Sequence, residues 1–315
     1  MGMSGGICNS SSAVIFNNIP GSRLGRQWLV DDYNLDATIE SGQAFRWKPH
    51  DGGWVGVIKD RWVYLKKRGG CIEAGVAVPC EDWRWLEEYL QLDLDYAQVV
   101  RELPADEPMR RAVECCRGMR LLRQDTWECL ASFILSSTKQ IVQIQQVIEL
   151  LCQRHGAPVV VPGGWPAVNA FPTAARLAAV SEVELRGCKM GFRAPYLLRA
   201  ACEVADARLD LGALSSLSMV GARARLMELP GVGRKIADCV LLFSLGFARA
   251  FPVDVWIQKA LRECYFSKDQ NISLARMHAL VETRFGPCAG YAQQYLFHYF
   301  RVVQRNRGSN DRLSR

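Results

Sequence analysis

The chain has 315 residues, which is long enough for one large domain or two closely packed domains with a hydrophobic core. Apolar residues make up 49% and charged residues 23%, as is typical of globular proteins, and no apolar run approaches the ~18 residues of a transmembrane helix. The net charge of +7 is compatible with a polyanionic partner but does not identify one. The twelve cysteines are scattered, without a CxxC pair or zinc spacing, which favours reduced intracellular thiols.

We expect the first third of the chain to be rich in β-structure. Residues 55–58 and 61–66 are rich in β-branched and aromatic side chains and flank Lys59 and Asp60, which predicts a hairpin. Residues 71–78 are a further candidate strand. Three tryptophans are expected to pack against this sheet: Trp47, Trp54 and Trp62.

From about residue 81 onward the apolar positions follow a helical repeat, beginning with residues 82–90. A helix over 125–137 begins with Asp125 three residues before Glu128, and residues 181–184 form a capping box. Residues 159–172 are rich in proline and glycine and predict a loop. Further helices are expected at 139–155, 194–207, 221–228, 233–245, 255–264, 273–285 and 288–303.

The segment 229–235, Leu-Pro-Gly-Val-Gly-Arg-Lys, lies between two predicted helices. Pro230 ends the first helix, and Gly231 and Gly233 permit positive φ angles and a close backbone approach. The second helix then presents free N–H groups and the positive end of its dipole, to which a DNA phosphate could bind. This is a helix-hairpin-helix pattern, although a glycine turn between two helices can equally be a plain corner.

Lys235 stands in the first turn of the second helix, where the helix dipole and the neighbouring Arg234 favour the neutral, nucleophilic amine. The helix is apolar on nearly all sides, which predicts a central, buried position. Lys235 and Cys239 are four residues apart and therefore share one face. The alternative is a solvated lysine beside a phosphate.

Asp254 follows Pro252 and Val253 where another helix should begin, so it is a candidate N-cap. It comes 19 residues after Lys235, with one helix and one turn between them. That spacing can return the chain to the start of the helix and place the carboxylate and the amine across one cleft. A purely structural cap remains the alternative.

A hairpin, a lysine and a Pro-Val-Asp segment in this order resemble the helix-hairpin-helix, Gly/Pro-Asp superfamily of DNA glycosylases, and within it the 8-oxoguanine DNA glycosylases. Four segments between about 15 and 305 carry the resemblance: 41–47, 128–137, 231–239 and 291–297. The endonuclease III and adenine glycosylase branches hold an iron–sulfur cluster on four cysteines after the catalytic Asp. Only Cys264 and Cys288 follow Asp254, so no cluster is expected. Alkylpurine glycosylases lack the lysine.

The resemblance implies a bifunctional DNA glycosylase/AP lyase of base-excision repair. Lys235 would attack C1′ of a damaged nucleotide flipped out of the duplex, form a Schiff base and cleave the strand by β-elimination. Asp254 would stabilise the oxocarbenium-like transition state. The resemblance leaves open another oxidised or alkylated purine as substrate, and a non-catalytic helix-hairpin-helix DNA-binding module remains the rival from a different class.

The family's base pocket matches four residues. The Gly42 carbonyl would accept the N7 hydrogen that 8-oxoguanine carries and guanine lacks, since two facing acceptors cost ~1–3 kcal/mol. Gln293 matches the amide that contacts the base edge, Phe297 the ring that stacks on the base, and Cys239 the residue on its other side.

Departures from the family fall on residues that contact the opposite strand. Thr138 and Lys139 stand where animal and fungal members carry asparagines, of which the one matching Thr138 contacts the orphaned cytosine. Gln143 replaces an arginine that recognises this cytosine, whereas Arg193 matches a second one. Phe192 replaces the tyrosine that wedges into the stack. We therefore expect a relaxed preference for the opposite base.

The remaining DNA contacts implied by the family lie at the hairpin and at Trp256, which replaces a phosphate-contacting histidine and resembles bacterial members. The implied partner is double-stranded DNA containing 8-oxoguanine. The protein is expected to act as a monomer and not to associate with a membrane. No cofactor or metal is expected, apart from a monovalent or divalent cation at the hairpin. The hairpin residues concerned are Gly231, Val232, Gly233 and Arg234.

The implied fold class is α+β, an N-terminal antiparallel β-sheet domain packed on a mainly α-helical helix-hairpin-helix domain. We expect the β-rich domain at 15–110 and the helical catalytic domain at 111–305, between a flexible N-terminus at 1–14 and a basic flexible tail at 306–315. The N-terminus lacks the basic and apolar regions of a signal peptide. The expected location is the cytoplasm (nucleoid) in a bacterium and the nucleus in a eukaryote.

Overall fold

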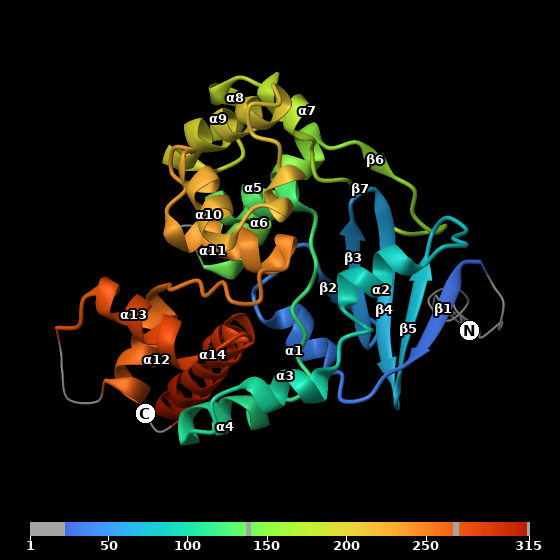
Figure 1. Cartoon of the computed structure of the whole chain (residues 1–315). Helices are drawn as coiled ribbons and strands as arrows, with labels where there is room; N and C mark the ends of the chain where they lie inside the picture. Colours follow the sequence, from blue (N-terminus) through green and yellow to red (C-terminus); the bar gives the residue numbers. More distant parts are fainter. Residues whose placement is uncertain (1–22, 137–139, 267–270, 314–315) are drawn as a thin grey trace.

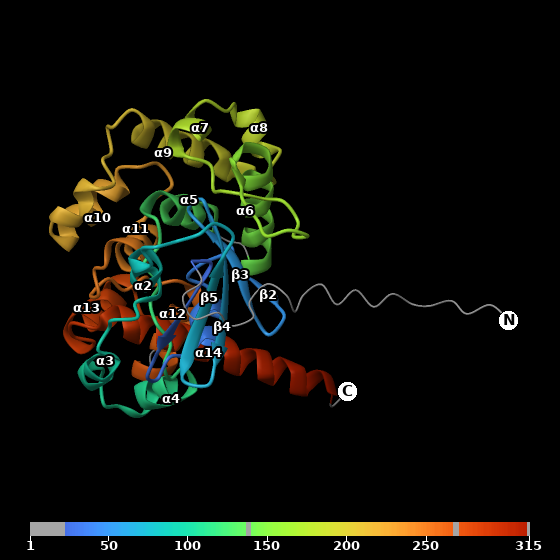
Figure 2. The same ribbon diagram turned by 90° about the vertical axis from the view of Figure 1, so that its right-hand side faces the viewer.

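A computed structural model describes residues 23–136, 140–266 and 271–313 (Figure 1). The predicted flexible segment 1–14, Ser137, Thr138 and Lys139 lie outside the described residues. The α+β class is confirmed: an antiparallel sheet forms the N-terminal part, and helices form the rest. Figures 1 and 2 both show α7, α8 and α9 at one end of the molecule and α4 and α14 at the other.

The sheet has five strands in the order β1-β5-β4-β3-β2, and every neighbouring pair is antiparallel. The predicted hairpin is confirmed, because β3 and β4 pair with Val57 opposite Trp62 and the turn places Lys59 at φ 56°. The outer strands β1 and β2 were not expected from the sequence. The strands are β1 (Gly25–Leu29), β2 (Lys48–His50), β3 (Gly53–Ile58), β4 (Arg61–Arg68) and β5 (Cys71–Val76).

Both faces of the sheet are covered, so the three tryptophans do not form one cluster. Trp47 and Trp54 pack on the face that meets α1 (Leu35–Glu40) and α2 (Arg84–Leu90). Trp62 points to the other face, since successive residues of a strand alternate in direction. There it meets Trp165, at 4.9 Å between ring centroids. The predicted loop 159–172 therefore covers this face, and it contains a short ribbon of β6 (Pro158–Val159) and β7 (Val168–Asn169).

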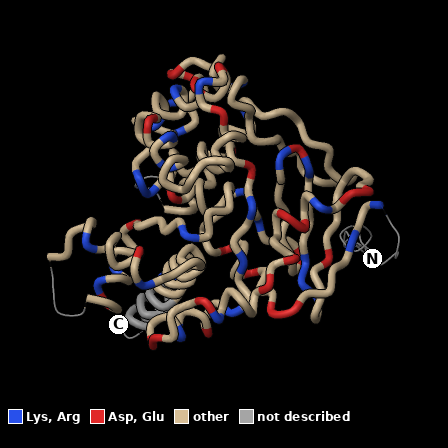
Figure 3. Tube along the Cα trace, viewed as in Figure 1, with Lys and Arg blue, Asp and Glu red and all other residues tan. Residues whose placement is uncertain are grey.

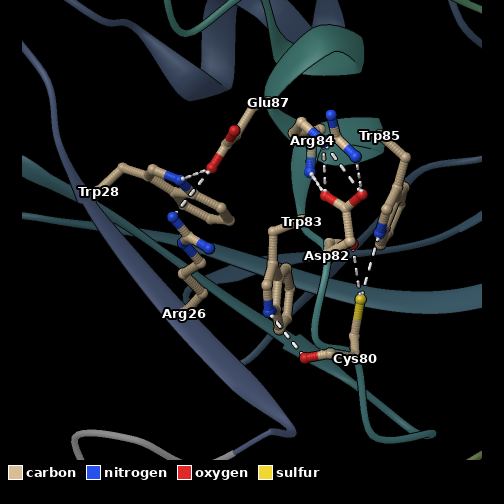
Figure 4. Close-up of polar contacts among 8 residues, drawn as sticks. All are labelled: Arg26, Trp28, Cys80, Asp82, Trp83, Arg84, Trp85 and Glu87. Carbon is tan, nitrogen blue, oxygen red and sulfur yellow. Dashed lines mark hydrogen bonds and ion pairs between the residues drawn. The ribbon is translucent and has the colours of Figure 1, made fainter.

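A cluster of tryptophans and charged residues joins β1 to α2 (Figure 4). The Trp28 indole donates to Glu87 Oε1 at 2.7 Å, and Arg26 pairs with the same carboxylate at 3.3 Å. Helix α2 begins two residues later than the predicted segment because the Asp82 carboxylate accepts from the Arg84 backbone N–H at 3.0 Å. We call these residues, with Cys80, Trp83 and Trp85, the Trp28 cluster.

The helical part confirms most of the predicted helices and the capping box at Ser181. Asp125 caps α5 by accepting from the Glu128 N–H at 3.0 Å. Helix α14 continues to Leu313, beyond the predicted end at Val303 and through most of the predicted tail. The helices are α3 (Tyr96–Glu102), α4 (Glu107–Cys115), α5 (Thr126–Ser136), α6 (Ile141–His155), α7 (Ala174–Ala178), α8 (Glu182–Arg186), α9 (Ala194–Ala205), α10 (Met219–Met227), α11 (Arg234–Val240), α12 (Val255–Tyr265), α13 (Leu274–Arg284) and α14 (Ala289–Leu313).

Helix α11 is the buried centre of the helical part, as its all-round apolar sequence predicts. It contacts α5 and α10, and residues 236–240 are all buried. The sequence predicts one continuous helix to Leu245, but the α-helical hydrogen bonding ends at Val240. A π-helical turn (Leu241–Leu245) follows and is closed by Gly246 at φ 82°. Such turns are frequent at functional sites.

Candidate active site

The structure contains a cleft of about 890 Å³. It is lined by residues from the turn after α1, the end of α5, the start of α6, α11, the start of α12 and α14. Lys and Arg are spread along the described chain among Asp and Glu, so neither sign of charge is confined to a single segment (Figure 3). The cleft brings together seven residues predicted from the sequence: Gly42, Lys235, Cys239, Asp254, Trp256, Gln293 and Phe297.

Lys235 is half-buried in the first turn of α11, and its amine faces the cleft. The buried neighbours Ile236 and Ala237 fix this orientation from behind. Its Nζ lies 3.3 Å from Ser136 Oγ and 5.0 Å from the centroid of the Phe133 ring. The predicted segment 128–137 contained Ser136, but its sequence gave no reason to expect this contact.

Asp254 is the N-cap of α12, so the predicted helix cap at this residue is confirmed. Its Oδ1 accepts from the Ile257 N–H at 2.8 Å. The same carboxylate also lines the cleft with Lys235, so capping and a place in the site are compatible. Burial raises the pKa of Asp254, while the hydrogen bond from Ile257 and the charge of Lys235 oppose this shift.

Cys239 lies one helical turn after Lys235 and is buried, as predicted from their spacing. Burial raises the pKa of its thiol to about 12, although the neighbouring Lys235 opposes the shift. The thiol is therefore neutral near pH 7 and forms a small apolar part of the wall.

Gly42 lines the same cleft, with φ +80°, a conformation that favours glycine. A Cβ at this position would lie 2.9 Å from Ile141 Cδ1 and 2.9 Å from Arg301 Nη1. The Arg301 guanidinium lies 5.3 Å from the centroid of the Phe297 ring. Arg301 was missed in the sequence, although its position four residues after Phe297 on one helix face could have revealed it.

Gln293 is only 4% exposed, and its Oε1 has no hydrogen-bond partner among the residues that the structure describes. Most buried polar atoms in proteins are paired, so an unpaired acceptor at a cleft is available to a ligand. Phe297, four residues later, lines the same cleft.

Of the two hairpin glycines, one has a positive φ. Gly231 has φ +79°, and a Cβ there would lie 2.6 Å from the Tyr196 ring. Gly233 is extended at φ −89°, so this glycine does not adopt the positive φ that it permits. Gly233 is instead the N-cap of α11 and leaves open space beside it, while Val232 is buried below the turn.

Arg234 does not line the cleft that contains Lys235. Its guanidinium pairs with Glu282 of α13 at 3.3 Å and with Asp238 at 3.7 Å. Asp238 is buried and also binds Arg223 at 2.6 Å. Arg234 therefore forms ion pairs with these two carboxylates. Its expected effect on the Lys235 amine stays a prediction.

Of the residues expected at the opposite strand, the three that the structure describes, Gln143, Phe192 and Arg193, do not line the cleft. Phe192 is 58% exposed, and the buried Arg193 places its guanidinium 4.2 Å from the Phe192 ring centroid. Gln143 is exposed and accepts from the Gln140 N–H at 3.1 Å, at the start of α6.

Two family models match consecutive parts of the chain. The 8-oxoguanine DNA glycosylase N-terminal domain matches residues 29–130, and the HhH-GPD superfamily of base-excision DNA repair proteins matches residues 131–283. The fold, the hairpin and the Lys–Asp cleft thus define a protein of the HhH-GPD class.

Two solved structures show to which family within this class the chain belongs. One is the Clostridium acetobutylicum 8-oxoguanine glycosylase/lyase bound to double-stranded DNA with cytosine opposite 8-oxoguanine. It is 31% identical, with a TM-score of 0.85, over 92% of this chain and 99% of that one. MBOgg1 in complex with a low-affinity DNA ligand is 35% identical, with a TM-score of 0.82, over 87% and 94% of the two chains. The chain belongs to the 8-oxoguanine DNA glycosylase family.

A curated relative supports this assignment over nearly the whole sequence. The probable N-glycosylase/DNA lyase of Methanothermobacter thermautotrophicus is 28% identical over an alignment that covers 90% of this chain and 97% of the relative. Among the described residues, no helix combines the length and apolarity needed to cross a membrane.

Proposed function

We propose that this protein excises 8-oxoguanine from double-stranded DNA and then cleaves the strand at the resulting abasic site. The observation that carries the proposal is the shared cleft of the Lys235 amine and the Asp254 carboxylate. The names of the relatives, 8-oxoguanine glycosylase/lyase and N-glycosylase/DNA lyase, support the same activity. The half-buried position of both groups in one cleft favours catalysis over a module that only binds DNA phosphates.

In the proposed reaction the Lys235 amine attacks C1′ of the flipped nucleotide. The C1′–N9 bond breaks, and the base leaves with its electron pair and takes up a proton. Asp254 stabilises the positive charge that develops on the sugar. Opening of the sugar ring gives a Schiff base, after which loss of a C2′ proton expels the 3′ phosphate by β-elimination.

Recognition of the base is proposed to use residues from several elements that line the cleft. The Gly42 carbonyl accepts the N7 hydrogen of 8-oxoguanine, and the amide of Gln293 binds the base edge. Phe297 stacks on one face of the base, and Cys239 lies at the other face. The Arg301 guanidinium lies 5.3 Å from the centroid of the Phe297 ring. Unmodified guanine would place an acceptor against the Gly42 carbonyl, at a cost of about 1–3 kcal/mol.

Trapping with borohydride tests the nucleophile. Incubation with an 8-oxoguanine duplex and borohydride should give a covalent protein–DNA adduct with the native protein and none with Lys235→Gln. Lys259→Gln is a matched control, because Lys259 is on the neighbouring helix α12 and pairs with Glu263 at 3.7 Å. Absence of an adduct from the native protein would favour a binding module.

We propose in addition that the base opposite the lesion is recognised weakly. The proposal depends on Thr138 and Gln143, which lack the groups that the family uses, and on the exposure of Phe192. Duplexes that differ only in the base opposite 8-oxoguanine should be cleaved at rates within about tenfold of one another. A larger preference for cytosine would refute it.

The remaining properties are proposals of the same kind. The enzyme is expected to act as a monomer without an organic cofactor, in the cytoplasm (nucleoid) of a bacterium or the nucleus of a eukaryote. A cation bound by the hairpin carbonyls would affect DNA affinity and not the chemistry. Treatment with EDTA should therefore leave the rate of base excision at saturating enzyme unchanged.

A further inference from the structure

Three glutamine side chains surround the turn that contains Gly42, and none has a role in the site as described. They are Gln43 in the turn itself, Gln124 before α5 and Gln294 on α14. We propose that Gln124 and Gln294 are positioning residues that hold the peptides on either side of Gly42, so that the Gly42 carbonyl is the acceptor presented to the lesion. This inference rests on the proposed excision of 8-oxoguanine.

The two amides bind the carbonyls that flank Gly42. Gln294 Nε2 donates to the Ser41 carbonyl at 3.0 Å, and Gln124 Nε2 donates to the Gln43 carbonyl at 2.7 Å. Within the described residues, hydrogen bonds occupy these two carbonyls but not that of Gly42. Gly42 is half-buried and lines the cleft, so its carbonyl is the acceptor of this turn that remains for a ligand.

The side chain of Gln43 holds the turn in place through hydrogen bonds to neighbouring backbone groups. Its side chain is fully buried, and Nε2 donates to the carbonyls of Thr38 and Arg120, each at 2.9 Å. Its Oε1 accepts from the Leu122 N–H at 2.7 Å. Both ends of the amide are satisfied, so the turn is attached rigidly to α1 and to residues 120–122.

The same glutamines connect the turn to the helices that carry the rest of the site. Gln294 follows Gln293 directly on α14. The backbone N–H of Gln124 donates at 2.8 Å to the carbonyl of Phe243, in the π-helical turn that continues the helix of Lys235. The acceptor for the base is thereby held at a fixed distance from both the base-edge amide and the nucleophile. A displacement of about 1 Å in such a site can reduce a rate about a hundredfold.

Replacing the amides by thioethers of similar length tests the proposal. In Gln294→Met and Gln124→Met, single-turnover excision of 8-oxoguanine should fall about tenfold each, because the Gly42 peptide loses a restraint. Cleavage of a duplex with a preformed abasic site should stay within about twofold, because no base has to be recognised there. Gln98→Met is the control, since the Gln98 amide binds Glu102 at 3.1 Å on the exposed helix α3.

Three outcomes separate this inference from the proposed function. A tenfold loss of excision with normal abasic cleavage supports it, and normal cleavage also shows that the variant is folded. Unchanged excision, or equal losses of excision and abasic cleavage, overturns the positioning role while the native activity stands. Failure of the native protein to excise 8-oxoguanine would instead refute the proposed function itself.

Discussion

The Trp28 cluster and the cleft around Lys235 contain similar polar groups but satisfy them differently. In the cluster the indole N–H groups all have acceptors: Trp28 has Glu87, Trp83 has the Cys80 carbonyl at 3.1 Å, and Trp85 has the Cys80 thiol at 3.4 Å (Figure 4). In the cleft, Gln293 Oε1 has no partner among the described residues. Paired groups stabilise the fold, whereas unpaired groups at the cleft are available to substrate.

This contrast separates effects on activity from effects on stability, and Asp254→Asn should give the largest separation. Asparagine caps a helix as well as aspartate does, so the melting temperature should change little. Loss of the negative charge removes transition-state stabilisation of about 3–4 kcal/mol, which is a loss of about 10²–10³-fold in excision. Single-turnover kinetics and thermal melting of the same preparation test this expectation.

The pH profile adds a control for that variant. Because burial raises the pKa of Asp254, the native enzyme should lose activity on acidification at a higher pH than a free aspartate would predict. Asp254→Asn should lack this acidic limb. An identical limb in both proteins would assign the titration to another group.

Glu128 combines features of both regions, because it lies on α5, the helix whose end lines the cleft, and has Arg46 as a partner at 3.7 Å. Burial raises its pKa from 4.5 to about 7, and Arg46 opposes the shift only in part. Between these values the folded protein binds more protons than the unfolded chain, so stability falls as pH rises through this window. The full effect is at most about 3 kcal/mol.

Glu128→Gln should remove this pH dependence. Denaturant unfolding at intervals from pH 4.5 to 8 measures the free energy of unfolding of both proteins. The difference between them should grow in favour of the variant up to about pH 7 and then stay constant. A constant difference over the whole range would mean that Glu128 titrates normally.

Gln293→Leu removes the unpaired acceptor itself. Excision of 8-oxoguanine should fall about tenfold, since one hydrogen bond to the base is lost. The free energy of unfolding should stay the same or rise, because no partner among the described residues is left behind. Cleavage at a preformed abasic site provides the control and should be unaffected, whereas a parallel loss of stability would show that Gln293 is paired in the free protein.

Local patterns predicted part of the sheet and part of the cleft, but not β1, which carries Trp28. The β-branched and aromatic runs predicted the β3–β4 hairpin, and helix periodicity placed Lys235 and Cys239 on one face. The contacts that complete the site are not local. Gln294 binds Ser41 across 253 residues, and Arg301 reaches Glu40 across 261. A sequence pattern contains no information on such pairs, and the π-helical turn after Val240 likewise follows from its tertiary surroundings.

Trp28→Phe should show the smallest effect and the reverse pattern to the cleft variants. Phenylalanine keeps the edge-to-face packing on Trp83, at 5.7 Å between ring centroids in the native protein, but loses the hydrogen bond to Glu87. The carboxylate keeps Arg26 as a partner, so the loss of stability should be only about 1 kcal/mol. Excision should equal that of the native enzyme. If excision fell while stability was kept, the cluster would have to be coupled to the cleft, and the separation between a stabilising region and a reactive one would be wrong.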